Sequence, residues 1–524
     1  MLDSSFTLGE VLPLVDEGCA IASNLSSYTL ALVSVSPEDD EALIESDRVD
    51  QIISSWDSAL LIFKSKIVGR KGEFSSCPEY SALLYRASIE GKHKMGKDEE
   101  ELFSRLSLYS SGAFSSLQDA LSGSLESAKG TLSSLRLLSS SPDRNVRKEA
   151  YEEEIRILRE NRITFAYALN SIKGESLYVD KKRGWKDPYE KSLFNSALRK
   201  GTLNLLISAL EEAVPLFGSY FEARRKLLHV DKLEWYDLHA NLEDGRTYTF
   251  EEAEEIVTGA FSSYSDAMGA LAKRAFSSGW IDGEVRKGKA SGAYDTEFLK
   301  SGESRVFLNF DGSLDSVFTL AHELGHAYHD QVAFKKGKAS LMRYPMTFAE
   351  TASSYAEALL FEYMLENTSG KERIALLFYY ASSLSDIVVD ILSRYYFELE
   401  FFKKRGNGFV SPESISRIMK DAQERTYGDE VGGKHAYMWA VKSHYYSFEE
   451  PFYNYPYAFG LLLALSLRYI KLGADEYEGI LSSWPEKDLE TLLGKKGLFI
   501  TTYDFWHRGV ALIEKVLKEL SDAL

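Results

Sequence analysis

Cysteine is scarce in this chain of 524 residues, which contains only Cys19 and Cys77. Two cysteines do not make the framework of several disulfides that holds many small secreted proteins together, so we expect both thiols to be reduced. Proline is also rare, with 11 residues in the chain. Long stretches are therefore free of the residue that most strongly breaks a helix.

Positive charge is in the minority. The chain has 61 Lys and Arg residues against 79 Asp and Glu residues, which gives a formal net charge of −18. A surface this negative repels the phosphate backbone of DNA and RNA. The composition therefore argues against a nucleic-acid partner.

No long hydrophobic run stands out. The most apolar segment, residues 457–467, is shorter than the roughly 20 residues that a helix needs to cross a bilayer. Residues 1–6 show no basic region followed by an apolar stretch, so we expect no signal peptide. These features predict a soluble, cytoplasmic protein without a membrane partner.

What the chain does contain is helical periodicity. Hydrophobic residues make up 44% of the sequence, enough for a large core, and they recur at three- and four-residue spacing along most of its length. This period predicts a mostly α protein. A Gly-rich stretch at 288–294 interrupts the pattern, and residues 305–310 are the best candidate for a strand. We expect an N-terminal helical lobe at 1–190 and a catalytic lobe at 191–524.

One motif carries chemistry. Residues 322–326 read His-Glu-Leu-Gly-His, the pattern H-E-x-x-H. On a helix, His322 and His326 lie one turn apart on one face, so both imidazoles can reach one metal ion, with Glu323 beside them to take a proton from water. Chance alone can produce so short a pattern. The flanking residues are apolar, however, and polar side chains buried among them would be costly without a partner.

A third ligand is needed, because a catalytic zinc site has three protein ligands and one water. The extended metzincin motif fails, since His329 and Val332 stand where it requires Gly and His. Glu350 and Glu357 lie on a second predicted helix, and seven residues are close to two helical turns. One of these glutamates can bind the metal, and the other can hold a ligand imidazole by its far nitrogen.

Several segments together resemble one enzyme family, the oligoendopeptidase F branch of the thimet oligopeptidase family of zinc metallopeptidases. The segments that carry the resemblance are His-Glu-Leu-Gly-His-Ala-Tyr-His at 322–329, Ala-Glu-Thr-Ala-Ser-Ser at 349–354 with Glu357, Asp-Leu-His-Ala at 237–240, Gly-Lys-Ala-Ser-Gly-Ala-Tyr at 288–294, Leu-Asn-Phe-Asp-Gly at 308–312, Leu-Asp-Ser-Val-Phe-Thr-Leu at 314–320 and Phe-Tyr-Asn-Tyr-Pro-Tyr-Ala-Phe-Gly at 452–460. They cover roughly residues 230 to 470. The N-terminal third matches only loosely.

The resemblance implies a fold of two helical lobes that enclose a deep substrate channel, with a small β-element next to the zinc helix. It implies that Glu350 is the third zinc ligand and that Glu357 holds a ligand imidazole. It also implies cleavage of internal bonds in short, unstructured peptides. One zinc ion is the expected cofactor, although cobalt or manganese could occupy the same ligands.

The predicted mechanism uses water activated by zinc, with Glu323 as general base and then as proton donor to the leaving amine. Donors to the oxyanion are expected from His444, Tyr453 and Tyr457. The two tyrosines are four residues apart and can share a helix face, which favours them over Tyr455. Packing could equally explain the tyrosines, and a satisfied core position could explain His444.

Other segments were harder to interpret. The predicted strand at 305–310 could pair with an extended peptide by a free edge, and residues 288–292 could form a mobile loop. Either segment could also be inert scaffold. Five more histidines receive no role: His93, His229, His239, His435 and His507.

Two alternative functions remain open. A metallocarboxypeptidase could use the same zinc motif, but it would need a cationic clamp for the substrate's free carboxylate, and no Arg cluster flanks the motifs. A catalytically inactive peptide-binding protein would not need Glu323, so the intact carboxylate argues against this function. Short peptides are the expected partners in each case, and the sequence does not indicate an oligomeric state.

Overall fold

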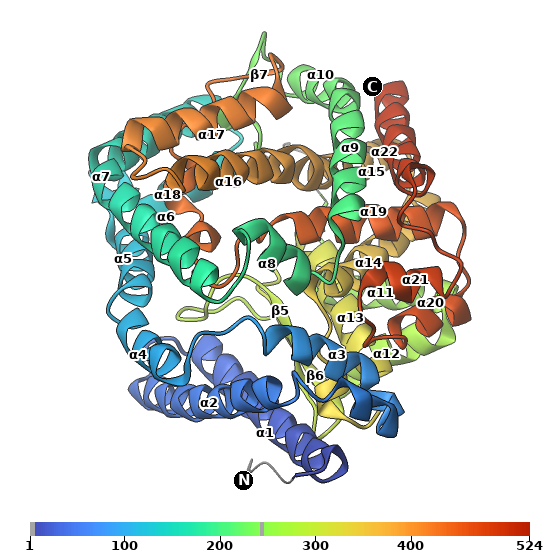
Figure 1. Cartoon of the computed structure of the whole chain (residues 1–524). Helices are drawn as coiled ribbons and strands as arrows, with labels where there is room; N and C mark the ends of the chain where they lie inside the picture. The colour runs from blue at the N-terminus through green and yellow to red at the C-terminus, as the bar shows by residue number, and fades with distance from the viewer. Residues whose placement is uncertain (1–5, 241–245) are drawn as a thin grey trace.

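The computed structural model describes residues 6–240 and 246–524, and helices dominate both ranges (Figure 1). The first helices in the chain are α1 (Leu8–Val35), α2 (Asp40–Lys66), α3 (Ser81–Glu90), α4 (Lys97–Ser107), α5 (Ser111–Ser124), α6 (Leu132–Leu137), α7 (Arg144–Lys182), α8 (Pro188–Asn195), α9 (Lys200–Ala213), α10 (Gly218–Leu227), α11 (Phe250–Tyr264) and α12 (Asp266–Ser277). The predicted mostly α fold is confirmed.

The remaining helices carry or surround the motifs found in the sequence. They are α13 (Leu314–Phe334), α14 (Met346–Asn367), α15 (Gly370–Ser385), the π-helical turn η7 (Asp386–Asp390), α16 (Ile391–Arg405), α17 (Pro412–Tyr427), α18 (Met438–Val441), α19 (Tyr455–Tyr469), α20 (Ala474–Leu481), α21 (Leu489–Gly494) and α22 (Tyr503–Ala523). Helix α14 packs against both α13 and α19 at the centre of this group.

Strands are short and few among the described residues. They are β1 (Glu126–Ser127), β2 (Gly130–Thr131), β3 (Leu233–Glu234), β4 (Ile281–Asp282), β5 (Tyr294–Phe298), β6 (Glu303–Phe307) and β7 (Val431–Gly432). The predicted strand at 305–310 overlaps β6, which starts earlier and ends at Phe307. Because β6 is the central strand of the order β4-β6-β5, the expected free edge on this strand is wrong.

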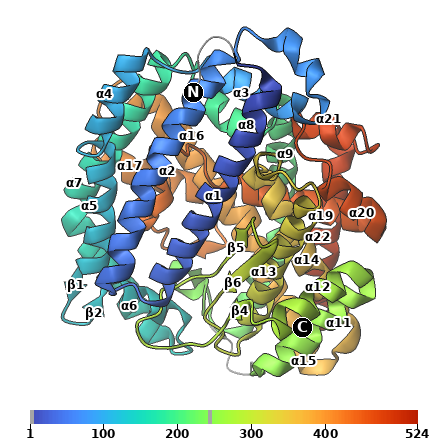
Figure 2. The same ribbon diagram turned by 90° about the horizontal axis from the view of Figure 1, so that it is seen from below.

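Two large hydrophobic cores and a small cluster of Leu135, Ala150 and Ile157 occur among the described residues. The larger core runs from Leu132 to Leu520 and includes residues of α7 together with those of α13, α14 and α19. The smaller core joins α1, α2 and α3 to Ala339 and Leu341. Figure 2 shows α1 and α2 side by side across one face of the molecule. The lobe boundary at residue 190 stays a prediction.

Two further expectations concern cysteine and membranes. Cys19 and Cys77 are both free thiols, as expected. Two helical stretches are long and apolar enough to cross a bilayer by length and composition, Leu8–Val35 and Gly370–Arg405. In the second, 56% of the most apolar window is buried inside the protein, and core helices of soluble proteins commonly pass this test. The cytoplasmic location stays a prediction.

A buried ionic cluster ties α7 to the segment that follows β3. The carboxylate of Asp237, which is 0% exposed, accepts hydrogen bonds from Arg144 at 2.8 Å and from Arg147 at 2.9 Å. Arg224 donates to the backbone oxygen of Asp237 at 2.7 Å. Arg147 is itself buried, so its charge depends on this one carboxylate for compensation.

We expect Asp237→Ala to lower the free energy of unfolding by about 3–5 kcal/mol, because it leaves the buried Arg147 charge unpaired. Urea unfolding followed by circular dichroism measures the change. The control is Glu149→Ala, which breaks an exposed pair with Lys129 at 2.8 Å and should cost less than about 1 kcal/mol. Equal losses in the two variants would contradict the argument.

Candidate metal centre

Helix α13 presents the H-E-x-x-H motif. The helix begins after Ser313, whose hydroxyl oxygen accepts a hydrogen bond from the backbone N–H of Ser316 and caps the first turn. The Nε2 atoms of His322 and His326 lie 3.2 Å apart, because side chains four residues apart lie on one face of a helix. The two imidazoles therefore point to a common position.

Helix α14 brings a carboxylate to the same position. Oε2 of Glu350 lies 3.5 Å from Nε2 of His322 and 3.9 Å from Nε2 of His326. Ligand atoms of the three residues lie within 4.8 Å of one another, and no other such group of three or more potential ligands occurs among residues 6–240 and 246–524. Two imidazole nitrogens and one carboxylate oxygen form a donor set that suits a catalytic metal ion.

Glu357, two turns further along α14, contacts the far side of the first histidine. Nδ1 of His322 donates a hydrogen bond to Oε1 of Glu357 over 2.5 Å. This contact leaves Nε2 of the same ring, which faces Glu350, free to bind a metal. Glu350 belongs to the group of three potential ligands, and Glu357 contacts the opposite nitrogen of His322. The roles that the resemblance implies for the two glutamates stay a prediction.

Electrostatics favour a cation among these groups. Burial lowers the pKa of His322, but the hydrogen bond to Glu357 and the nearby carboxylates outweigh it and raise the pKa to about 10. Burial lowers the pKa of His326 well below its ordinary value and raises that of Glu350. A divalent ion would offset the cost of keeping carboxylates ionised in this interior.

Glu323 lies beside the group of three. Its side chain is buried, and burial raises its pKa to about 7. The backbone N–H of Asp295 in β5 donates a hydrogen bond to the carboxylate and opposes this rise. A carboxyl group whose pKa lies near neutrality can both accept and release a proton, as a general base must.

The three predicted hydrogen-bond donors lie together next to this centre. The hydroxyls of Tyr453 and Tyr457 are 3.2 Å apart, and the ring of His444 stacks on that of Tyr453 at 5.7 Å between centroids. Burial and then the charge of Glu350 raise the pKa of Tyr457, so this phenol stays protonated near the carboxylate. Burial and the neighbouring cations lower the pKa of His444 to about 3 and keep its ring neutral.

Tyr455 is held elsewhere. Its side chain is buried, and its hydroxyl oxygen lies 3.1 Å from the backbone oxygen of Ser192 and 2.8 Å from Oγ of Ser196, within hydrogen-bond distance of both. Pro456 lies in the first turn of α19, where the backbone N–H that proline lacks would have no partner within the helix. Tyr453 precedes the helix, and Tyr457 follows within its first turn.

His329 is a core residue. Its ring is 0% exposed and stacks on Tyr344 at 3.7 Å between centroids. Burial lowers its pKa to about 3, so it stays neutral. It does not belong to the group of potential metal ligands.

Sequence reasoning missed two glycines that let the helices approach one another. A Cβ on Gly325 of α13 would lie 2.8 Å from Cβ of Ala356 on α14. A Cβ on Gly460 of α19 would lie 2.6 Å from the carbonyl carbon of Glu350. Neither position tolerates a side chain without movement. A glycine in the interior of an apolar predicted helix, such as Gly460, was the available signal.

Comparisons with known proteins agree with this geometry. A sequence profile described as peptidase family M3 matches residues 137–495. The chain is 25% identical over 469 residues to oligopeptidase PepF of Bacillus subtilis, covering 85% of this chain and 69% of that protein. It is 24% identical over 470 residues to group B oligopeptidase PepB of Streptococcus agalactiae, covering 86% and 78%.

A solved structure shares the fold. The crystal structure of oligoendopeptidase-F from Enterococcus faecium superimposes with a TM-score of 0.72 at 19% identity, covering 98% of this chain and 92% of that one.

We expect Glu350→Ala to lose bound metal, whereas Glu357→Ala should weaken metal affinity by about 10–100-fold, the usual effect of removing a group that orients a ligand imidazole. Metal content after dialysis and titration with a chromophoric chelator measure both. Glu366→Ala, an exposed position on α14, is the control. Full metal content in Glu350→Ala with loss in Glu357→Ala would exchange the two roles.

We expect Gly460→Ala to lower the free energy of unfolding by about 1–3 kcal/mol and to weaken metal affinity, because the new methyl group pushes Glu350 away from the histidines. Thermal unfolding and metal titration measure the two effects. Gly201→Ala is the control, since a Cβ there meets nothing within 4 Å. Unchanged metal affinity in Gly460→Ala would show that this crossing does not position Glu350.

Proposed function

Because the chain belongs to peptidase family M3, a family of metallopeptidases, we propose that it is a zinc-dependent endopeptidase that hydrolyses internal bonds of short, unstructured peptides. The observation that carries the proposal is the group of His322, His326 and Glu350, whose ligand atoms lie within 4.8 Å of one another. The printed names of the relatives, oligopeptidases PepF and PepB, support a peptide substrate.

These three residues would hold one zinc ion, which has a preference for imidazole and carboxylate ligands in catalytic sites. Bound there, zinc would supply Lewis acidity, which lowers the pKa of water and polarises a peptide carbonyl. The short contact of Glu357 with His322 keeps the imidazole in the tautomer that binds the ion.

Glu323 moves the proton. Its pKa of about 7 allows it to take a proton from the attacking water at neutral pH and to deliver that proton to the nitrogen of the leaving amine. Its buried surroundings raise the affinity of the carboxylate for the proton between these two steps.

Tyr453, Tyr457 and His444 donate hydrogen bonds to the charge that develops on the carbonyl oxygen. The hydroxyls of the two tyrosines lie 3.2 Å apart, so both can reach one oxygen after a small rotation. Both phenols are preorganised by packing, so little reorganisation accompanies the reaction.

Exopeptidase activity is the competing function, and one observation favours it. A cluster of cations lies close to His444, although the sequence showed no Arg cluster near the motifs. An inactive peptide-binding protein is less consistent with a buried Glu323 next to the metal ligands.

We expect internally quenched peptides to be cleaved at internal bonds, with loss of activity after removal of metal by a chelator and recovery on adding zinc. Glu323→Gln should lower kcat/KM by roughly 10²–10⁴, the usual contribution of a general base, while metal content stays at the wild-type level. Mass spectrometry of the products locates the cleaved bonds.

The matched control for this experiment is Glu366→Gln, the same change at an exposed position on α14. Unimpaired turnover by Glu323→Gln would refute the mechanism. Release of terminal residues alone would identify an exopeptidase.

A further inference from the structure

A second interior cavity lies between the N-terminal helices α6 and α7 and the segment that carries η7 and α16. Its volume is about 270 Å³. Its walls include Arg136, Glu154, Asp386, Asp390, Arg394 and Lys442. Two of these acidic residues begin and end η7, the single π-helical turn among the described residues, and such turns are frequent at functional sites.

Most charges in this cavity are already paired. Arg394 binds Asp390 at 2.5 Å on the same wall. Glu154 lies 3.5 Å from Arg136 and 3.4 Å from His435 on the other. These pairs leave little net charge on those side chains.

Lys442 is the exception among the cations. Its side chain is partly buried in the wall, and its ammonium makes no hydrogen bond or ion pair with residues 6–240 or 246–524. Burial and the charge of Arg394 lower its pKa to about 8, and the carboxylates of Asp390 and Asp386 oppose this shift. The cavity therefore holds a cation that is costly to keep charged and that an anion could compensate.

Arg394 also has unused capacity. One of its guanidinium nitrogens donates a hydrogen bond to Oδ1 of Asn454 at 3.0 Å. Two other buried donors, Nε of Arg394 and Nδ2 of Asn454, have no hydrogen-bond partner in the described parts of the chain. Buried donors of this kind are normally satisfied, and an unsatisfied group points to a missing ligand or water.

The cavity adjoins the proposed catalytic donors by two direct connections. Lys442 precedes His444 by two residues, and the ring of His444 stacks on Tyr453. Arg394 binds Asn454, the residue that follows Tyr453. The wall of the cavity and the proposed donors are thus linked through neighbouring residues.

We propose that this cavity is a subsite for a carboxylate of the bound peptide, held by the ammonium of Lys442 with the guanidinium of Arg394 beside it. The proposal rests on the proposed peptidase function and narrows its substrate class. The carboxylate is either the free C-terminus of the substrate or an acidic side chain near the scissile bond. A free C-terminus would place the cut at a fixed, short distance from the end of the peptide.

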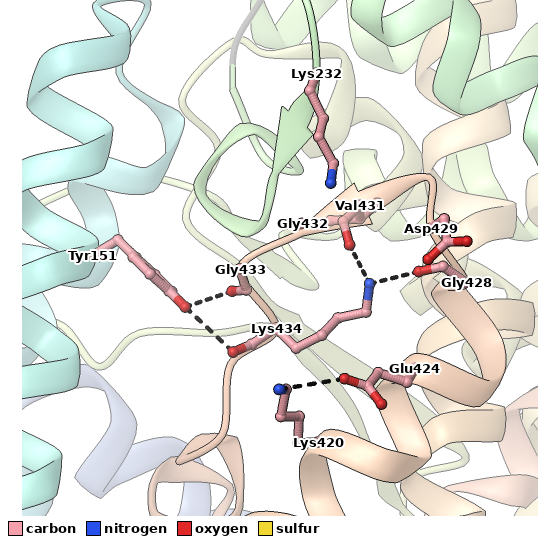
Figure 3. A pocket seen from close by; sticks show the side chains of 10 residues that line it. All are labelled: Tyr151, Lys232, Lys420, Glu424, Gly428, Asp429, Val431, Gly432, Gly433 and Lys434. Carbon is pink, nitrogen blue, oxygen red and sulfur yellow. Dashed lines mark hydrogen bonds and ion pairs between the residues drawn. The ribbon is translucent and has the colours of Figure 1, made fainter.

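A larger hollow on the molecule lacks these features (Figure 3). It has a volume of about 660 Å³ and also contains lysines. The ammonium of Lys434 already donates to the backbone oxygens of Gly428 and Val431, and Lys420 pairs with Glu424 at 3.4 Å. Lys232 on its rim is exposed, so solvent compensates its charge. Lys232 is therefore a suitable control position for substitutions of Lys442.

The test compares matched peptides on the zinc-loaded protein. One pair differs only in a C-terminal carboxylate or amide, and a second pair, both amidated, differs only in a Glu or Gln close to the cleaved bond. Cleavage gives kcat/KM. Binding of the same fluorescent peptides to Glu323→Gln gives Kd without turnover, so failure of the subsite and failure of the peptidase function are distinguishable.

We expect the carboxylate form of one pair to be favoured by about 10–100-fold in kcat/KM and in Kd, the range for a hydrogen bond to a charged group. Lys442→Gln should bring this ratio close to one, whereas Lys442→Arg should keep most of it. Lys232→Gln, the same change at the exposed rim of the larger hollow, should keep the wild-type ratio. If the peptides with a C-terminal carboxylate and amide differ in kcat/KM, the subsite binds the C-terminus. If the peptides with Glu and Gln differ, it binds an acidic side chain.

Several outcomes would overturn the proposal. Ratios near one for both pairs in the wild-type protein would do so, and so would a wild-type ratio in folded Lys442→Gln. Loss of binding on acetylating the peptide N-terminus, with no effect of the C-terminal amide or of the Glu, would show that Asp386 binds an ammonium group instead. If Lys442→Gln fails to fold, a Lys442→Arg ratio near one would reject Lys442 as the carboxylate-binding group.

Discussion

Close packing of three helices is the constraint on which the candidate site depends. Glu350 can meet the two histidines of α13 only if α14 lies against α13, and it can meet Tyr457 only if α19 lies against α14. Gly325 and Gly460 stand at these two contacts and leave room for no side chain. Interiors pack as densely as crystals, so even one methyl group here must move a ligand. The positions of the three candidate metal ligands thus depend on how closely the backbones of these helices approach one another.

The cost of this arrangement is electrostatic. The helices bury Glu323 and Glu350 beside two imidazoles, of which only His322, with its pKa raised to about 10, can carry a positive charge, because burial lowers the pKa of His326 well below its ordinary value. A protein that places ionisable groups in its interior normally pairs or neutralises them. At this centre one divalent ion would perform the task that several salt bridges perform elsewhere. At Asp237, by contrast, two arginines compensate the buried carboxylate.

The sequence predicts best those features that are formed by residues close together in the chain. His322, Glu323 and His326 fall within two turns of one helix, so a period of 3.6 residues is enough to bring them together. Spacing alone did not predict which of Glu350 and Glu357 binds the metal and which holds the imidazole. Only the resemblance to a known family assigned a role to each. In the structure Glu357 contacts Nδ1 of His322 and Glu350 faces Nε2, contacts that depend on how α14 packs against α13. The strand at 305–310 was located by composition, but its pairing on both sides depends on β4 and β5, whose positions no local pattern indicates.

The cavity that contains Arg394 and Lys442 shows why sites formed by distant parts of the chain could not be predicted. Arg394 and Lys442 lie on separate elements, and each looks like an ordinary solvated charge in the sequence. Their meeting depends on how α16 packs against the segment before α19 and on how α7 closes the opposite wall. Because α7 shares the large core with α13 and α14, the wall of the cavity and the candidate metal ligands belong to one packed unit. A substrate group bound by Lys442 would therefore have a fixed position relative to Glu323, and the distance between the two would determine which bond of the peptide is cut.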